Sequence, residues 1–186
     1  MKLPGDIESR DLDLLEPQFA DKLRELQINA DRLGFKMHIA TTVRGPITQA
    51  KLFCRSRTVE EIAVYRDILL GAEAPVLASL YKDEYTAISP PVTQFGPGMS
   101  WHQWGLAADI FQVVDGKAKW TGPEQKELAR KAKRIPGLFG CSMTTRTVEM
   151  PHFHYQDNFY GTPFLKPNFI RHWRDIERKM RQKYEL

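Results

Sequence analysis

Residues 100–114, SWHQWGLAADIFQVV, place His102 and Asp109 seven positions apart around a single glycine. On one continuous helix the two side chains would lie about 10 Å apart along the axis, and on one straight strand they would point to opposite faces. Gly105 permits a turn between them, and the small residues that follow let neighbouring groups approach. The end of the stretch alternates and is rich in β-branched residues. We therefore expect a turn that leads into a strand.

The remaining periodicity predicts helices around a small sheet. Helices are predicted in residues 17–35, in 59–80 with a break near Gly71 and Pro75, in 121–135 with Thr121 as N-cap, and around 50–53 after a turn at 44–49. Strands are predicted in residues 36–43 and, after a loop at 136–140, in 145–156, with an interruption near Pro151. We expect an α+β fold, a small antiparallel sheet with flanking helices, in a single domain over residues 1–186.

The composition is that of a globular protein. Of the 186 residues, 42% are hydrophobic and 27% are charged, and no segment approaches the roughly 18 apolar residues that span a membrane. The first 17 residues, MKLPGDIESRDLDLLEP, carry charges and prolines where a secretory signal has its apolar region. We therefore expect synthesis in the cytoplasm, no transmembrane segment, and reduced thiols at Cys54 and Cys141 rather than a disulfide.

Basic residues gather near the C-terminus. The net charge of +4 and the pI near 9.1 favour anionic partners, although a small excess also serves solubility. In residues 166–186 seven Lys and Arg outnumber three Asp and Glu, and apolar residues recur at helical spacing. The segment is thus predicted as a basic amphipathic helix. We favour a helix docked on the core with a solvated basic face over a dedicated surface-binding device.

A second cluster of metal-binding residue types lies in residues 149–154, EMPHFH. Its proline disfavours a helix, and in an extended segment His152 and His154 fall on one face, so either could reach an ion. A carboxylate near a ligand histidine suits metal-assisted hydrolysis, because it takes up the proton of a water that the metal acidifies. Alternatively, Glu149 is a surface residue and the histidines pack with aromatic neighbours. Combined with the pair in 100–114, the cluster meets the three-ligand pattern of catalytic zinc with one histidine to spare.

Three motifs together resemble one known family. Residues 98–109, GMSWHQWGLAAD, resemble the SxHxxGxAxD motif of the D-Ala-D-Ala carboxypeptidase/VanY/L-alanyl-D-glutamate peptidase family, zinc peptidases that cut peptidoglycan stem peptides. Residues 149–153, EMPHF, are similar to the D/E-x-P-H-F signature of its endolysin-like branch. Residues 42–58 are similar to that branch's YRSxxxQxxLY…GRT stretch. The motifs come in the family's order and cover most of residues 15–156.

The resemblance implies a fold and a set of roles. The fold it implies is that of the zinc D-Ala-D-Ala carboxypeptidases, which is also described as hedgehog-like. Position by position, it implies zinc ligation by His102, Asp109 and His152, general acid/base catalysis by Glu149, an electrostatic clamp at Arg44, and substrate or supporting contacts from Ser100, Gln49 and His154. Arginine suits the clamp because its guanidinium stays protonated and offers paired donors to a developing oxyanion. The ligand types are compatible with other divalent ions as well as with Zn²⁺.

Some positions depart from the family pattern. Val43 and Gly45 stand where the pattern has tyrosine and serine around the arginine, which leaves the orientation of Arg44 open. His154 stands where the branch often has Gln or Glu, and it either contacts substrate or competes with the neighbouring histidine as a ligand. Residues 59–92 are longer than the family core needs and are predicted as a helical insertion that forms a lid, a wall of the groove or a partner surface.

The function that these features favour is zinc-dependent hydrolysis of bacterial peptidoglycan stem peptides, with the L-Ala–D-Glu bond preferred. The alternatives are a D-Ala-D-Ala carboxypeptidase or dipeptidase and a non-catalytic wall-binding module in which zinc is structural. Nucleic-acid binding is not expected, because the chain lacks helix-turn-helix, RNP and zinc-finger patterns. We expect a monomer that reaches the wall by lysis or through a partner and that is held on anionic wall polymer by its C-terminal helix.

Overall fold

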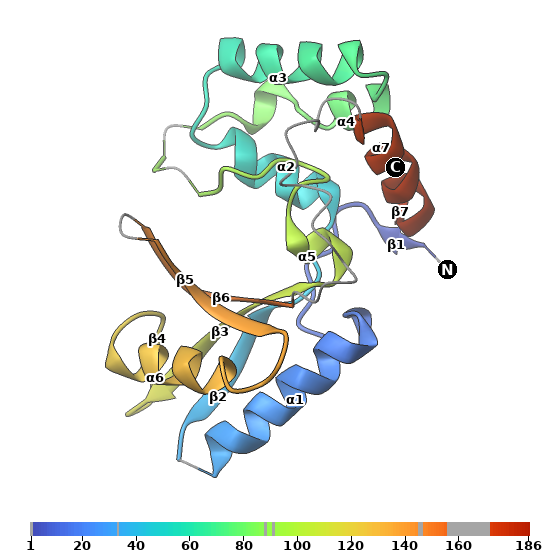
Figure 1. Ribbon diagram of the computed structural model, residues 1–186. Coiled ribbons are helices and arrows are strands. Elements are labelled where there is room, and N and C mark those ends of the chain that lie inside the picture. Colours follow the sequence, from blue (N-terminus) through green and yellow to red (C-terminus); the bar gives the residue numbers. More distant parts are fainter. Residues whose placement is uncertain (1, 33, 88, 91, 145–146, 156–171) are drawn as a thin grey trace. The chain divides into compact units, whose positions relative to one another are not determined.

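The computed structural model describes residues 2–32, 34–87, 89–90, 92–144, 147–155 and 172–186, without the side chains of 124 and 141–150 (Figure 1). The described residues fall into two compact units. The first draws on residues 1–8, 44–103 and 162–186, and the second on 9–43 and 104–161.

The second unit is built on an antiparallel sheet. Its strands are β2 (Lys36–Thr41), β3 (Ala107–Val114), β4 (Lys117–Lys119), β5 (Leu138–Thr144) and β6 (Thr147–Tyr155). The order is β2-β3-β6-β5, and β4 pairs with the end of β3. Together with its helices, this sheet confirms the predicted α+β class.

Two helices pack on this sheet (Figure 1). α1 (Pro17–Asp31) begins with a proline. Proline suits this position, because the N–H group that it lacks would have no hydrogen-bond partner within the helix there. It buries the predicted apolar stripe of Phe19, Leu23, Leu26 and Ala30. α6 (Pro123–Ala132) contacts α1 as well as β3, β5 and β6. The short 3-10 turn η1 (Leu12–Leu14) precedes α1.

The two faces of the sheet carry different side chains. Tyr155 of β6 is buried, and its ring lies 6.2 Å from that of Phe19 in α1, so alternate residues of β6 face the helices. Because side chains alternate along a strand, His152 and His154 point to the opposite face. Asp109 of β3 pairs with His152, and cross-strand partners share a face. The polar groups therefore project from the face opposite α1 and α6.

The first unit is mainly helical. It contains α2 (Pro46–Cys54), α3 (Val59–Gly71), α4 (Pro75–Ser79), the 3-10 turn η2 (Asp83–Tyr85), α5 (Trp101–Trp104) and α7 (Trp173–Lys183), with β1 (Leu3–Pro4) and β7 (Tyr184–Glu185) paired in parallel. α3 starts with a capping box in which the Thr58 hydroxyl accepts from the Glu61 N–H and the Glu61 carboxylate accepts from the Thr58 N–H.

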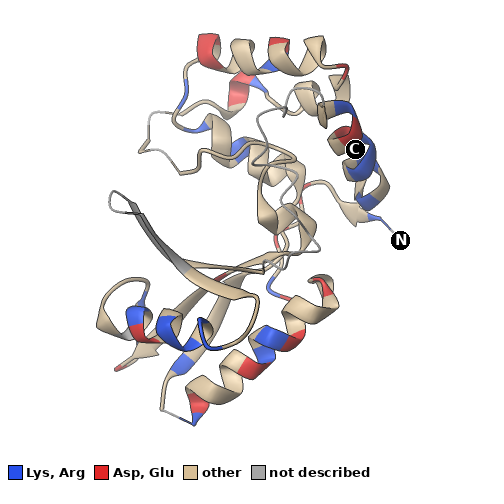
Figure 2. Ribbon diagram, viewed as in Figure 1, with Lys and Arg blue, Asp and Glu red and all other residues tan. Residues whose placement is uncertain are grey.

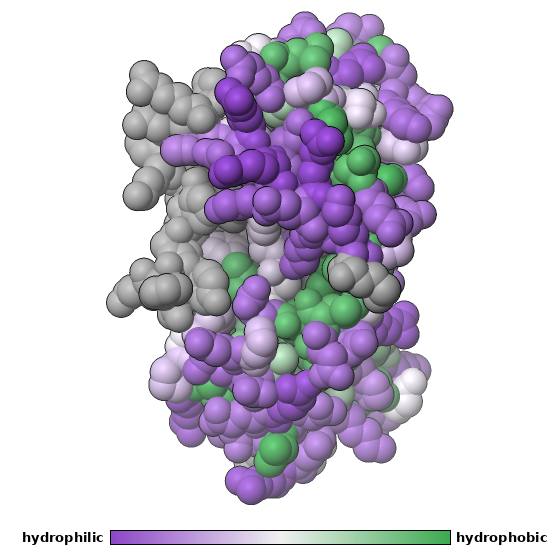
Figure 3. All heavy atoms as spheres, turned by 90° about the vertical axis from the view of Figure 1, so that its right-hand side faces the viewer, coloured by the Kyte–Doolittle hydropathy of each residue, from purple (hydrophilic) through white to green (hydrophobic). Residues whose placement is uncertain are grey.

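The C-terminal helix α7 is amphipathic. Trp173, Ile176 and Met180 are buried, while its basic residues are largely exposed, and blue Lys and Arg segments are visible on α7 in Figure 2. Figure 3 shows the face that carries α7, on which hydrophilic side chains predominate. α7 occupies the second half of the segment predicted as a basic helix, of which residues 166–171 lie outside those described.

Four local predictions were wrong. Residues 138–140, predicted as part of a loop, belong to the strand β5, because pairing with β6 extends the segment 138–144. α2 begins at Pro46, inside the predicted turn. The N-cap of α6 is Gly122 rather than Thr121. β6 continues through Pro151, and a register irregularity in the pairing with β5 at this point accommodates a residue that lacks an N–H.

The described residues contain no helix long and apolar enough to cross a bilayer. Cys54 is buried and is a free thiol, as predicted. The Cys141 side chain lies outside the described part.

Candidate metal site

The turn between His102 and Asp109 is made by the backbone of Gly105. Its φ of +74° lies in the left-handed region, which glycine enters without strain. A Cβ there would also lie 3.1 Å from the Leu14 carbonyl oxygen and 3.2 Å from the Glu16 nitrogen. The Glu16 N–H donates to the Gly105 carbonyl at 3.0 Å. The glycine thus allows both the turn after α5 and the close packing of the chain before α1.

Asp109 and His152 meet through strand register. They are direct partners in the antiparallel pair of β3 and β6, and side chains at such positions have Cβ atoms about 5 Å apart. Asp109 Oδ1 lies 3.4 Å from His152 Nδ1, and the side chains are 20% and 19% exposed. A carboxylate and an imidazole are therefore held together without relying on a flexible loop.

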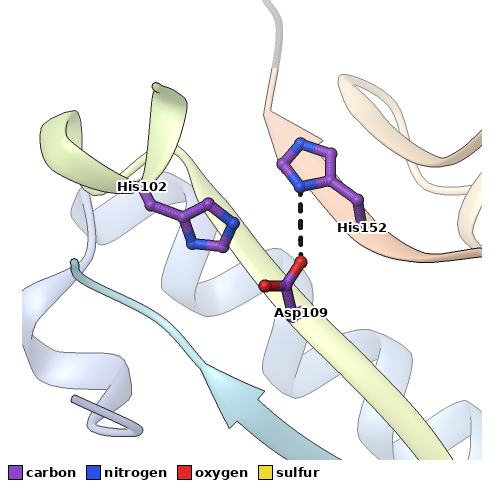
Figure 4. A group of neighbouring side chains, drawn as sticks. All are labelled: His102, Asp109 and His152. Carbon is purple, nitrogen blue, oxygen red and sulfur yellow. Dashed lines mark ion pairs between the residues drawn. The ribbon is translucent and has the colours of Figure 1, made fainter. Parts of the chain in front are cut away.

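His102 completes a group of three possible metal ligands (Figure 4). It lies in α5 and is 3% exposed. One ligand atom from each of His102, Asp109 and His152 lies within 4.8 Å of the other two. Donor atoms in a tetrahedral zinc site are about 3–3.5 Å apart, and two imidazole nitrogens with one carboxylate oxygen form a donor set that zinc accepts. The three side chains fit such an ion after small movements.

His154 lies beside this group without belonging to it. Its ring is 5.6 Å from that of His152 and stacks 5.5 Å from Phe139. Burial, with a smaller contribution from His152, lowers the pKa of His154 to about 4. The ring is therefore neutral at neutral pH and forms part of the wall next to the three ligands.

Arg44 is fixed through its backbone next to His102. Its N–H donates to the His102 carbonyl oxygen at 3.4 Å. Its guanidinium Nε lies 3.4 Å from Glu8 Oε1, and the side chain is 13% exposed.

The glycine at position 45, where the family pattern has serine, is explained by close packing, because a Cβ there would lie 2.2 Å from the Gly5 carbonyl oxygen. The segment before Glu8 therefore occupies the space that a serine side chain would need.

Gln49 and Ser100 are buried supporting residues. Gln49 is 1% exposed, and its side-chain N–H donates to the Phe95 carbonyl at 2.6 Å. Ser100 is 6% exposed and precedes α5, where its carbonyl accepts the Gln103 N–H at 3.1 Å. These contacts organise the loop that leads into His102.

Glu149 lies in β6, three residues before His152, and pairs with Ser142 of β5. Its side chain is outside the described part, so its role remains a prediction.

The sequence reasoning did not find Gln103 and Tyr184. Gln103 is fully buried, and its side-chain oxygen accepts the N–H groups of Gly98 and Ser100. The buried Tyr184 hydroxyl donates to the Gln103 carbonyl. Gln103 could have been selected from the sequence because it is adjacent to His102. No local sequence pattern indicates that Tyr184 supports this segment.

An α+β fold with a His/Asp/His group defines a candidate metallohydrolase. The chain belongs to the VanY family, described as D-alanyl-D-alanine carboxypeptidase, whose model matches residues 12–157. This is a family of zinc peptidases that act on peptidoglycan, and the chain is accordingly a peptidase. No curated protein sequence matches the chain significantly.

Several solved structures are similar to the chain. The L-Ala D-Glu endopeptidase ChiX of Serratia marcescens is 13% identical, with 81% of this chain and 90% of that chain covered and a TM-score of 0.44. The LD-carboxypeptidase LdcB is 14% identical, with 98% and 76% covered and a TM-score of 0.41. VanYB in complex with D-alanine-D-alanine is 20% identical, with 95% and 87% covered and a TM-score of 0.45.

Proposed function

We propose that the protein is a zinc-dependent peptidase that hydrolyses the L-Ala–D-Glu bond of peptidoglycan stem peptides. The observation that carries this proposal is the grouping of His102, Asp109 and His152 within 4.8 Å, on elements that the family motifs span. Three protein ligands leave a position for water or substrate, as catalytic zinc requires. A Zn²⁺ ion held there supplies a Lewis acid that polarises the scissile carbonyl and acidifies a water.

Glu149 is the proposed general base and acid. It accepts a proton from the attacking water and then donates that proton to the amine nitrogen as the peptide bond breaks. Its place in the Glu-x-Pro-His-Phe arrangement, three residues before the proposed ligand His152, supports this role.

Arg44 is the proposed oxyanion partner. Negative charge develops on the former carbonyl oxygen, and a fixed guanidinium stabilises it more in the transition state than in the ground state. The backbone hydrogen bond from Arg44 to His102 supports this role, since it ties the arginine to a ligand residue. Glu8 restrains the guanidinium through the ion pair.

The choice of bond rests on the sequence. The Glu-x-Pro-His-Phe arrangement of residues 149–153 and the spacing of Arg44 and Gln49 favour the endopeptidase. The matching family description favours the second candidate, a D-Ala-D-Ala carboxypeptidase. A third candidate, a wall-binding module with structural zinc, requires a filled fourth ligand position, and His154, whose ring lies 5.6 Å from that of His152, is a candidate to fill it.

The test is digestion of purified peptidoglycan by the zinc-loaded protein, with fragments identified by mass spectrometry. New L-alanine C-termini and D-glutamate N-termini support the endopeptidase, and they should be lost with a chelator or in Glu149→Gln. Release of terminal D-alanine instead identifies the carboxypeptidase. Absence of any product from folded, zinc-bound protein refutes both enzymes and supports the binding module.

We further propose that the protein acts as a monomer at the cell wall, to which lysis or a partner delivers it after synthesis in the cytoplasm. The basic face of α7 holds it on anionic wall polymer there. The exposed cations of α7 support the retention, because the apolar side of the helix is already buried within its own unit.

A further inference from the structure

The segment that carries His102 is too short to hold its own shape. α5 has four residues, and a single helical turn is unstable in isolation because nucleation costs more than one hydrogen bond returns. Its carbonyl groups also lack the helical partners that a longer helix would supply. The orientation of the His102 ring must therefore be set by contacts from outside α5.

Gln103 fixes the chain on the N-terminal side of His102. It is fully buried, and its Oε1 accepts the N–H of Gly98 at 2.8 Å and the N–H of Ser100 at 3.3 Å. One side-chain oxygen thus closes residues 98–103 into a compact loop. Loss of this acceptor would leave two buried N–H groups without their partner, which is costly.

Tyr184 fixes the chain on the C-terminal side. Its hydroxyl donates to the Gln103 main-chain carbonyl at 2.5 Å, and the residue is 0% exposed. Tyr184 follows α7 directly, and in β7 it is paired with Leu3 of β1. The donor is therefore held by elements on both sides, and it reaches the peptide group directly after His102 from 81 residues away in sequence.

We propose that Tyr184 is a positioning residue for metal binding, which acts through the Gln103 carbonyl to hold the His102 imidazole in place. This inference rests on the proposed function, since it assumes that His102, Asp109 and His152 bind the metal. Buried hydroxyl and carbonyl groups make a directional contact that an apolar side chain cannot replace. The last residues of the chain are thereby part of the support of the site.

Tyr184→Phe in the full chain tests the proposal, because it removes the hydroxyl and keeps the ring. The readout is the dissociation constant of Zn²⁺, measured by competition with a chromogenic chelator. Loss of a residue that orients a metal ligand weakens binding by about 10-fold to 100-fold, and we expect the lower end because Tyr184 acts through a carbonyl. The stability of each variant is measured by urea unfolding.

Tyr155→Phe is the matched control. It also removes a hydrogen-bonded hydroxyl, which donates to Gln18 Oε1 at 2.7 Å on the helix-covered side of the sheet. We expect similar losses of stability in both variants and weaker zinc binding only in Tyr184→Phe. Equal zinc affinity in wild type and Tyr184→Phe, or an equal loss in both variants, overturns the proposal.

A replacement variant and the zinc binding of the wild type complete the test. Should Tyr184→Phe fail to fold, Tyr184→His replaces it, since its shorter ring also withdraws the donor from the Gln103 carbonyl. Unchanged zinc affinity in Tyr184→His then overturns the positioning role. A wild-type protein that binds no zinc refutes the proposed function itself, and the positioning proposal with it, whereas unaffected variants of a zinc-binding wild type refute the positioning alone.

Discussion

Replacing Gly105 by alanine should destabilise the protein through two separable effects. The φ of +74° places an alanine in the left-handed region, which costs about 1–2 kcal/mol. The new Cβ would also lie 3.1, 3.2 and 3.3 Å from backbone atoms of Leu14, Glu16 and Leu15. These atoms belong to the main chain and cannot rotate away. Disturbing the hydrogen bond from the Glu16 N–H to the Gly105 carbonyl adds about 1 kcal/mol.

Gly116→Ala separates the two effects. Its φ is +72°, but nothing lies within 4 Å of the Cβ position, so only the conformational cost applies. Replacing glycine also restricts the unfolded chain, which returns about 0.4–1 kcal/mol in both variants. We therefore expect Gly105→Ala to lose about 1–2 kcal/mol more than Gly116→Ala.

Urea unfolding followed by circular dichroism measures this difference. A chelator competition on the same samples measures zinc affinity, which should fall only in Gly105→Ala because the turn brings His102 toward Asp109. If the two variants lose equal stability and both retain wild-type zinc affinity, the assignment of the turn to Gly105 is refuted.

Three further predictions concern other parts of the chain. Gly45→Ser should lower stability by about 1–3 kcal/mol in thermal unfolding, because its Cβ would lie 2.2 Å from the Gly5 carbonyl oxygen, whereas Gly71→Ser has open space and should be close to neutral. In a Cys141→Ser background, Cys54 should resist a thiol reagent at pH 8 until the protein is unfolded. The residue is buried, and burial raises the pKa of its thiol to about 11. Rapid labelling of the folded protein would contradict this expectation. Retention on isolated cell walls should decrease as salt rises, because salt screens the attraction between the cations of α7 and anionic polymer. Lys179→Gln with Arg181→Gln on α7 should weaken retention more than Lys126→Gln with Arg130→Gln on α6, and equal retention of the wild type and both double variants would exclude α7 from wall binding.

Much of the fold follows from local sequence. The apolar stripe of α1 and the alternation after Gly105 predict their elements directly, because amphipathic periodicity records which face is buried. β5 could not be predicted in this way, since its extended form comes from pairing with β6, which is a tertiary effect. The same pairing lets β6 continue through Pro151, which local sequence alone predicts as an interruption.

Only some residues of the candidate site could be predicted from the sequence. His102, Asp109 and His152 were singled out because residue type and spacing both indicate metal binding, and the structure places them together. Tyr184 could not be found, because a hydroxyl that reaches a carbonyl 81 residues away leaves no local pattern. Gln49 was selected by motif, but only its buried hydrogen bond to Phe95 shows that it supports a loop.

If His102, Asp109 and His152 hold one metal ion, the zinc stoichiometry of the protein depends on these three side chains. Metal-free protein is dialysed against Zn²⁺, and bound metal is measured by mass spectrometry for wild type, Asp109→Asn and Asp115→Asn. We expect one ion per chain in wild type and in Asp115→Asn, which alters a carboxylate in the turn just after β3, and little or none in Asp109→Asn. Full and equally tight loading of Asp109→Asn would contradict it.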